Sequence, residues 1–289
     1  MDLEPGTGLT ALAAMVGSKD LLVKMLGPTA DYLGGGLKDW TEKAFTNLGR
    51  IFQRAKALLG EAVNEPGSVP PRVLKEVLAE GPFCEDEIWA EYFGGVLASS
   101  RSESTRDDRG ARFAAQIGRL STYQVRAHFL FYRLFKTLFD GDAATVNTDE
   151  GRQALRIFVP FPAFASGMEL ADEKFDVVLG HSITGLVAEG LLRSSYHWGD
   201  VDLHKKTGFP EATEGGIVVQ PSSIGAELFL WSHGRGDVST YSLLRKDTVL
   251  TSEVLLKLTP GVRAVRPGGP LLDDLLRKTD SPSPAEGTA

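Results

Sequence analysis

The chain of 289 residues contains a single cysteine, Cys84, so it has no internal disulfide and no thiolate metal site. We therefore expect a reducing compartment, and the cytoplasm fits best. Long hydrophobic runs are also missing, since no stretch approaches the roughly 18 to 20 apolar residues of a transmembrane helix. The acidic start, MDLEPGTG, lacks the positive charge with which a secretory signal begins.

The chain has fewer basic residues than acidic residues. The 31 lysines and arginines face 38 aspartates and glutamates, which gives a formal net charge of -7. This balance argues against a surface shaped globally for nucleic acid and leaves room only for a local basic patch. What the chain does have is 42% hydrophobic residues, which is enough for a substantial core. Its length suits two modest domains or one large domain.

The first half of the chain has the spacing of helices. Apolar residues recur at three- and four-residue intervals within 9–60, and Leu21, Leu22, Met25 and Leu26 are typical of this pattern. Pro70 and Pro71 suit the first turn of a helix that ends near Glu80. Further helices are expected over 111–119 and over 121–139, where Ser121 is a plausible N-cap.

The segment EIWAEYFGGVLASS, residues 87–100, raises the question of whether its aromatic residues form a ligand platform or a packing face. Its apolar residues come as doublets every four residues, which lines one broad face of a helix and favours packing: Ile88 and Trp89, Tyr92 and Phe93, Val96 and Leu97. Gly94 and Gly95 cost about 1 kcal/mol each in a helix interior. We therefore expect a neighbouring helix to approach closely there.

The second half changes character. Pro160 and Pro162 exclude a long helix from the otherwise ambiguous stretch 140–175. A helix around Ile183, a short strand at 216–220 and a helix capped by Ser222 or Ser223 follow the order of a winged-helix-like unit. The fold class expected is mainly α, an N-terminal α-helical bundle with a small C-terminal winged-helix-like α+β unit. The expected division is an N-terminal helical region at 1–60, a bundle core at 61–140, the winged-helix-like unit at 141–260 and a disordered tail at 261–289.

One motif resembles a catalytic element. FDVVLGHSITGLVAEG, residues 175–190, reads as an apolar strand, then Gly-His-Ser, then a helix, like the nucleophile elbow of α/β-hydrolases. Thr184 stands where the second glycine of that motif belongs, and the preceding sequence is mostly helical. A catalytic Ser182 is therefore the alternative reading, and a serine at a helix N-cap is the favoured one.

No other set of residues points to chemistry. His181, His197, His204 and His233 lack metal-ligand spacing, and His128 fits a partly buried histidine with a hydrogen-bond partner. The triplet Gly34-Gly35-Gly36 lacks the Gly-Lys-Ser/Thr ending of a phosphate loop, and Glu85, Asp86, Glu87 and Glu91 are explained by a helix start. We expect no catalytic residues, no metal and no cofactor.

A nucleic-acid interface is the weaker reading of the C-terminal unit. Its candidate contacts, to phosphate or to a protein partner, are Arg193, Lys205, Lys206 and Arg235. These cations are few, and Glu211, Glu214 and Glu227 dilute them. A structural or protein-contact module is favoured over a DNA-binding regulator.

Several segments, taken in order, resemble one known family. They are LAAMVGSKDLLVKMLGPTADYLGGGL, VPPRVLKEVL, CEDEIWAEYFGGVLASS, ARFAAQIGRLS, GLVAEGLL and IVVQPSSIGAELF. Together they resemble the Abi-alpha family of bacterial abortive-infection proteins over roughly residues 1–235. The most specific part is the acidic-led helix that ends in Leu97-Ala98-Ser99-Ser100. The positions that carry the resemblance are Asp86, Glu87, Trp89, Leu97, Ala98, Ser99 and Phe113.

The resemblance implies antiviral defence, in which an infected bacterium stops phage propagation by halting growth or dying. It implies no particular reaction, and the motif positions are expected to be structural. We therefore expect a non-enzymatic component that acts through an unknown protein partner or through peripheral contact of its N-terminal region with a membrane.

Overall fold

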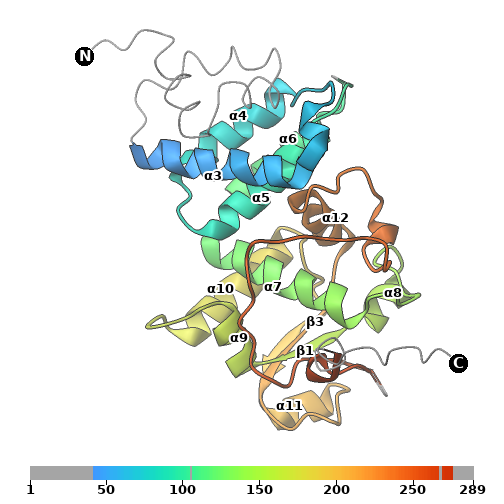
Figure 1. The fold of residues 1–289 in the computed structure, drawn as a ribbon. Coiled ribbons are helices and arrows are strands. Elements are labelled where there is room, and N and C mark those ends of the chain that lie inside the picture. The colour runs from blue at the N-terminus through green and yellow to red at the C-terminus, as the bar shows by residue number, and fades with distance from the viewer. Residues whose placement is uncertain (1–41, 105, 267–268, 276–289) are drawn as a thin grey trace, which may run out of the picture. The chain divides into compact units, whose positions relative to one another are not determined.

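A computed structural model describes residues 42–104, 106–266 and 269–275 of the chain (Figure 1). In this part the fold is mainly helical with one small antiparallel sheet, as expected. The predictions for residues 1–41, including the Gly34-Gly35-Gly36 triplet, lie outside the described residues, as does the tail beyond 275.

The elements up to the middle of the chain are helical. They are α3 (Glu42–Leu59), η3 (Gly60–Asn64), α4 (Pro71–Glu80), η4 (Gly81–Phe83), α5 (Glu87–Ser100), α6 (Arg109–Gly118), α7 (Thr122–Leu138) and α8 (Asp149–Ala154). Pro71 occupies the first turn of α4, as its fixed φ predicts. Ser121 caps α7 in a reciprocal pair, because its Oγ accepts from the backbone N–H of Gln124 and its own N–H donates to Gln124 Oε1.

Strands and short helices alternate in the second half. They are β1 (Ile157–Pro160), α9 (Phe161–Gly167), α10 (Phe175–Ala188), β2 (His197–Gly199), α11 (Val201–Lys206), β3 (Gly216–Val219), α12 (Ser223–Ser232), η5 (Thr240–Ser242) and β4 (Arg263–Ala264). The prolines explain the ambiguous stretch, since Pro160 ends β1 and Pro162 lies in the first turn of α9. The strand expected at 216–220 is present as β3, and Ser222 Oγ caps α12 by accepting from Gly225 N–H at 2.9 Å.

The chain divides into two compact units, and the division falls within α7 and α12. Unit 1 contains the described residues up to Arg126 together with Glu227–Ser239 and Val249–Leu255. Unit 2 contains Ala127–Ala226, Thr240–Thr248 and the described residues from Leu256 onward. Each unit is therefore discontinuous in sequence and differs from the four consecutive ranges expected. The reason is that segments after residue 226 pack into the core of unit 1.

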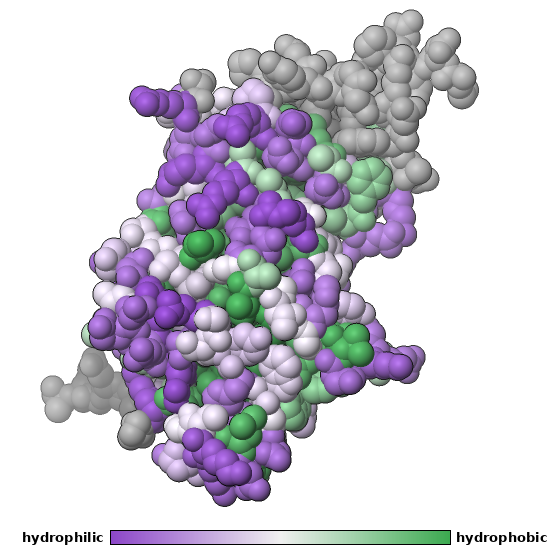
Figure 2. All heavy atoms as spheres, turned by 180° about the vertical axis from the view of Figure 1, so that it is seen from behind, coloured by the Kyte–Doolittle hydropathy of each residue, from purple (hydrophilic) through white to green (hydrophobic). Residues whose placement is uncertain are grey.

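Unit 1 is built around α5. Helix α3 packs along α5, α4 packs against α6, and α6 packs against α5. The buried residues of α3 follow its apolar stripe, with Leu48, Ile51, Phe52 and Ala55 no more than 1% exposed. Apolar residues are not confined to the interior, since Phe83 is 68% exposed. Figure 2 shows hydrophilic side chains over much of the visible surface, with hydrophobic residues between them.

Unit 2 contains a four-stranded antiparallel sheet in the order β2-β3-β1-β4. Phe158 of β1 pairs with Val218 of β3, and both join Phe209, Ala212 and Val265 in a buried cluster on one side of the sheet. The aromatic stretch of α7 is buried throughout, as its apolar circumference predicts: Phe129, Leu130, Phe131, Leu134, Phe135 and Leu138 are no more than 3% exposed.

The prediction of a disordered tail from residue 261 onward is wrong for the residues that join the sheet. Arg263 and Ala264 form β4 and pair with Phe158 and Ile157 of β1. Leu272 N–H also donates to Val262 O at 2.9 Å. Proline and glycine enrichment predicted a loop from 261 onward, but a two-residue edge strand needs only a few unblocked backbone groups to pair.

Candidate functional site

The positions that the sequence analysis singled out lie on or beside α5, so α5 and its contacts are the candidate site. Asp86 is the N-cap of this helix, and its Oδ1 accepts from the Ile88 N–H at 3.0 Å. Arg126 Nη2 lies 3.3 Å from the same carboxylate oxygen. Glu87 is exposed in the first turn, where negative charge suits the helix dipole.

The aromatic stripe of α5 is core and does not line an open ligand site. The six residues of its three doublets, from Ile88 to Leu97, are no more than 6% exposed. Trp89 stacks on Phe93 with ring centroids 6.0 Å apart, and its Nε1–H donates to Thr122 Oγ1 at 3.1 Å. The indole therefore has its polar group satisfied inside the packed unit. The packing interpretation is confirmed.

The two adjacent glycines of α5 admit two different neighbours. A Cβ at Gly94 would lie 2.8 Å from Arg54 Cβ and 2.9 Å from the carbonyl oxygen of Ile51, both on α3. A Cβ at Gly95 would overlap the backbone carbonyl of Ser232 at the end of α12. Close approach of neighbouring helices was predicted from the sequence. Consecutive residues of a helix point about 100° apart, so Gly94 and Gly95 face different neighbours, α3 and α12.

The C-terminal end of α5 is joined to the last turn of α12 and to the segment that follows it. Ser99 Oγ donates to the carbonyl of Trp231 at 2.9 Å and accepts from the N–H of Gly236 at 3.0 Å. Trp231 also packs on Phe113 of α6, with ring centroids 5.1 Å apart, beneath the Arg109 guanidinium at 5.2 Å from its ring. Leu97 and Ala98 are buried beside this contact. Each of these motif side chains thus has a packing role in unit 1.

A buried ion pair links α3 to α5, and sequence reasoning missed it. Arg54 Nε lies 2.7 Å from Glu91 Oε2, and Arg54 Nη2 donates to Glu91 Oε1 at 2.8 Å. The two side chains are 6% and 1% exposed. Burial raises the pKa of Glu91, and the charge of Arg54 opposes that rise. The available signal was an arginine within the apolar stripe of α3, between Ile51 and Ala55.

The segment Val249–Leu255 contacts this ion pair. Its Thr251 carbonyl accepts from Arg54 Nη2 at 2.6 Å, and Glu253 lies 3.5 Å from Arg54 Nη1. Ser252 contributes a side-chain hydrogen bond to Glu91. The guanidinium and the carboxylate therefore each have a hydrogen-bond partner besides the other, which helps to offset the cost of burying the pair.

The histidines do not gather into one site. His233 belongs to unit 1, whereas His128, His181, His197 and His204 belong to unit 2. His128 is fully buried, where partial burial was expected, and its Nε2 bonds Gly225 O at 3.1 Å. No group of three or more potential metal ligands occurs within the described ranges.

His197 and His204 are the closest pair, with ring centroids 5.3 Å apart. His204 Nε2 donates to Gly216 O at 3.1 Å, and His197 Nε2 lies 2.8 Å from Thr207 Oγ1. Burial, followed by the charges of His204 and Arg156, lowers the pKa of His197. This pair joins β2, α11 and β3, and its geometry is that of a structural contact.

Ser182 lies inside a helix, which corrects both readings of its motif. The whole segment Phe175–Ala188 is α10, so no strand leads into the serine and the serine is not at the N-cap. Its side chain is fully buried, whereas a nucleophile elbow presents the hydroxyl at a sharp turn. The geometry that a Ser182 hydrolase requires is therefore missing from this segment.

The candidate basic residues are split between the two units. Arg235 belongs to unit 1 and pairs with Asp237 at 3.1 Å, while Arg193 belongs to unit 2 and lies 3.3 Å from Asp149. Lys205 and Lys206 are exposed in the last turn of α11. Within unit 2, the two lysines are the most accessible of the candidate contacts.

Comparison with family models, with curated proteins and with solved structures finds no match to this chain. None of the helices in the described residues combines the length and the apolar character needed to cross a membrane. The lone cysteine, Cys84, donates to the Glu80 carbonyl at 3.3 Å. Burial, together with the Glu80 carboxylate, raises the pKa of its thiol to about 12, so the reactive thiolate is suppressed.

Proposed function

We propose that the protein is a non-enzymatic component of a bacterial abortive-infection system, located in the cytoplasm, that acts through a protein partner or a membrane surface. The observation that carries the proposal is the arrangement of the motif positions. Asp86, Trp89, Ser99 and Phe113 all contribute to holding α5 in unit 1. The resemblance to the Abi-alpha family thus involves a scaffold.

The role of α5 argues for action through surfaces. Its motif groups are engaged in capping, stacking and hydrogen bonding within the unit, and Glu91 is neutralised by Arg54. A group that is already paired and buried is poorly placed to bind or activate a substrate. Function then depends on what the assembled helices present outward, which is how a partner-binding or membrane-binding component works.

The test is a plaque assay in a bacterial host that expresses the full chain, across a broad phage panel. We expect the protein to reduce phage yield. We expect this protection to be lost in Gly95→Leu, which weakens the packing around α5. Gly180→Ala is the matched control, because a Cβ at Gly180 meets no described atom within 4 Å. Unchanged phage yield across the panel, together with no toxicity in the host, would discard the proposal.

A DNA-binding regulator is the second candidate, favoured by the exposed Lys205 and Lys206 of α11. The succession α10, β2, α11, β3, α12 and the antiparallel pairing of β2 with β3 support a winged-helix-like arrangement for unit 2. We propose that the N-terminal helices form a bundle. DNA binding should then weaken steeply with salt and fall in Lys205→Glu/Lys206→Glu. DNA binding that is unaffected by salt and by the two substitutions would count against this candidate, and so would the absence of binding at low salt.

A further inference from the structure

One aspartate of unit 2 is shared by two arginines. Arg152 Nη2 donates to Asp149 Oδ1 at 2.5 Å, and Arg193 Nη1 lies 3.3 Å from the same oxygen. Arg152 and Asp149 belong to α8, whereas Arg193 lies in the connection between α10 and β2. The three side chains carry two positive charges and one negative charge, so the carboxylate neutralises only part of the positive charge that surrounds it.

Both arginines are held in place by hydrogen bonds to the rest of the unit. Arg152 Nη1 donates to Val146 O at 2.6 Å and to Ser223 Oγ at 3.3 Å. The backbone N–H of Arg193 donates to Gln220 O at 3.2 Å. The points from which both side chains extend are therefore fixed in advance, which reduces the ordering cost of binding a ligand between them.

The donors of the two guanidiniums are not all used. The Nε atoms of Arg152 and Arg193 are both buried and have no hydrogen-bond partner in the part of the chain that the structure describes. The Arg193 side chain is 38% exposed, so solvent reaches its guanidinium. A guanidinium carries five N–H donors in a fixed fork. Asp149 therefore satisfies only part of the donor capacity of the pair.

The position of Asp149 favours negative charge, and its side chain is free to leave. The hydrogen bond from Arg152, followed by the charges of Arg152 and Arg193, lowers the pKa of Asp149. The Asp149 side chain is 62% exposed. Helix α8 is capped by its neighbour Thr148, whose Oγ1 accepts from Gly151 N–H at 3.0 Å. Movement of the Asp149 carboxylate away from the arginines thus leaves the cap of α8 intact.

We propose that Arg152 and Arg193 form a binding site for a phosphate group, and that the Asp149 carboxylate occupies this site until a phosphate displaces it. A phosphate monoester carries about −1.5 to −2 charges at pH 7 and three acceptor oxygens. It matches two guanidiniums better than a single carboxylate does, and arginine binds phosphate oxygens with two parallel N–H donors. The ligand is inorganic phosphate or a small phosphorylated molecule.

Isothermal titration calorimetry on the full chain tests the proposal, at about pH 7.5, where a phosphate monoester is mostly a dianion. Inorganic phosphate should bind Asp149→Asn at least about tenfold more tightly than the unsubstituted protein, because the internal carboxylate no longer competes for the arginines. Acetate, which carries one charge, should bind Asp149→Asn at least about tenfold more weakly than phosphate at the same ionic strength.

A second titration, with adenosine monophosphate, separates the two sources of phosphate. Tighter binding than inorganic phosphate supports the site as one for a phosphorylated molecule. Binding equal to or weaker than that of inorganic phosphate supports a site for phosphate itself.

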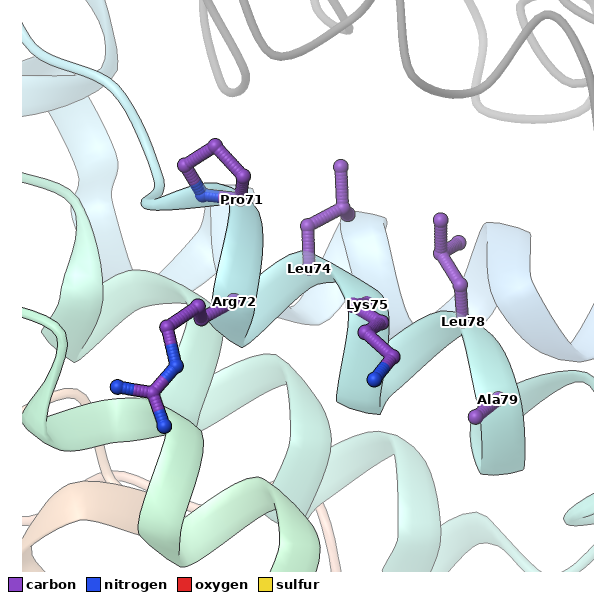
Figure 3. Close-up of a pocket in the computed structure, with 6 residues that line it drawn as sticks. All are labelled: Pro71, Arg72, Leu74, Lys75, Leu78 and Ala79. Carbon is purple, nitrogen blue, oxygen red and sulfur yellow. The ribbon is translucent and has the colours of Figure 1, made fainter.

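Two arginine variants give the matched comparison. Arg193→Gln in the Asp149→Asn background should weaken phosphate binding at least about tenfold, because one of the two guanidiniums is removed. Arg72→Gln in the same background should leave phosphate binding unchanged. Figure 3 shows the Arg72 side chain extending from α4 of unit 1, and its ion pair is with Asp108. Circular dichroism checks that each variant keeps the thermal midpoint of its parent.

Four results would overturn the proposal. They are no binding of phosphate to Asp149→Asn, acetate binding as tight as phosphate binding, full binding in Arg193→Gln, and a loss in Arg72→Gln as large as that in Arg193→Gln. Since all of these titrations use the purified protein, the phosphate site and the proposed role in phage defence stand or fall separately.

Discussion

Gly95→Ala should destabilise the protein although alanine is the better helix former. The gain in helix propensity is about 1 kcal/mol. This gain is opposed by the overlap of the new Cβ with the Ser232 carbonyl. The carbonyl is part of the helix backbone, so it cannot move away by a side-chain rotation. Relief requires α5 and the end of α12 to separate, and overpacking of this kind costs about 1 to 3 kcal/mol, or more where backbone is displaced. Subtracting the propensity gain leaves a net loss of about 0 to 2 kcal/mol, and we expect the upper end of this range because the new Cβ overlaps backbone atoms.

Thermal unfolding followed by circular dichroism measures this loss. About 2 to 4 °C per kcal/mol is typical of chains of this size, so the midpoint should fall by several degrees. Gly180→Ala is the control, because it also replaces a glycine inside a helix but meets open space, and it should raise stability by about 0.5 to 1 kcal/mol. If Gly95→Ala is as stable as Gly180→Ala, the close approach at α5 and the reasoning built on it are wrong.

Two further predictions concern the ion pair and the histidine pair. Arg54→Met should cost about 3 to 5 kcal/mol in urea unfolding because it leaves Glu91 buried and charged, whereas Arg54→Met/Glu91→Leu should recover much of that loss; equal losses would contradict the pairing. The lowered pKa of His197 means that the folded state binds its proton less readily, so stability should decline as pH falls below about 6.5, and His197→Gln should flatten that decline.

Local signals in the sequence were sufficient to predict where a helix begins. Two prolines mark the start of α4, Ser121 and Gln124 mark the start of α7, and the acidic turn at Asp86 marks the start of α5. The glycine pair of α5 predicted close neighbours because its cost needs compensation. In each case the physical cause lies within a few residues of its effect.

Other features depend on residues that are far apart or on apolar runs that fit two structures. FDVVLGHSITGLVA suits a buried strand followed by a turn as well as a buried helix, and periodicity alone does not separate them. The structure makes it α10, and Ser182 is buried there. Arg54 and Glu91 are 37 residues apart, so nothing local to either residue names the other as its partner. Proline and glycine enrichment similarly concealed the pairing of β4 with β1.

The core of unit 1 is completed by residues made late in synthesis. The contact of Ser99 with Trp231 joins residues 132 positions apart, and that of Arg54 with Thr251 joins residues 197 apart. Closing such long loops costs entropy before the contacts repay it, so we expect these contacts to form late in folding. Helix α5, together with Arg54, is therefore a packing surface for the segments Glu227–Ser239 and Val249–Leu255. Its glycine admits the end of α12, its serine binds the turn after α12, and its glutamate, through Arg54, binds the segment Val249–Leu255.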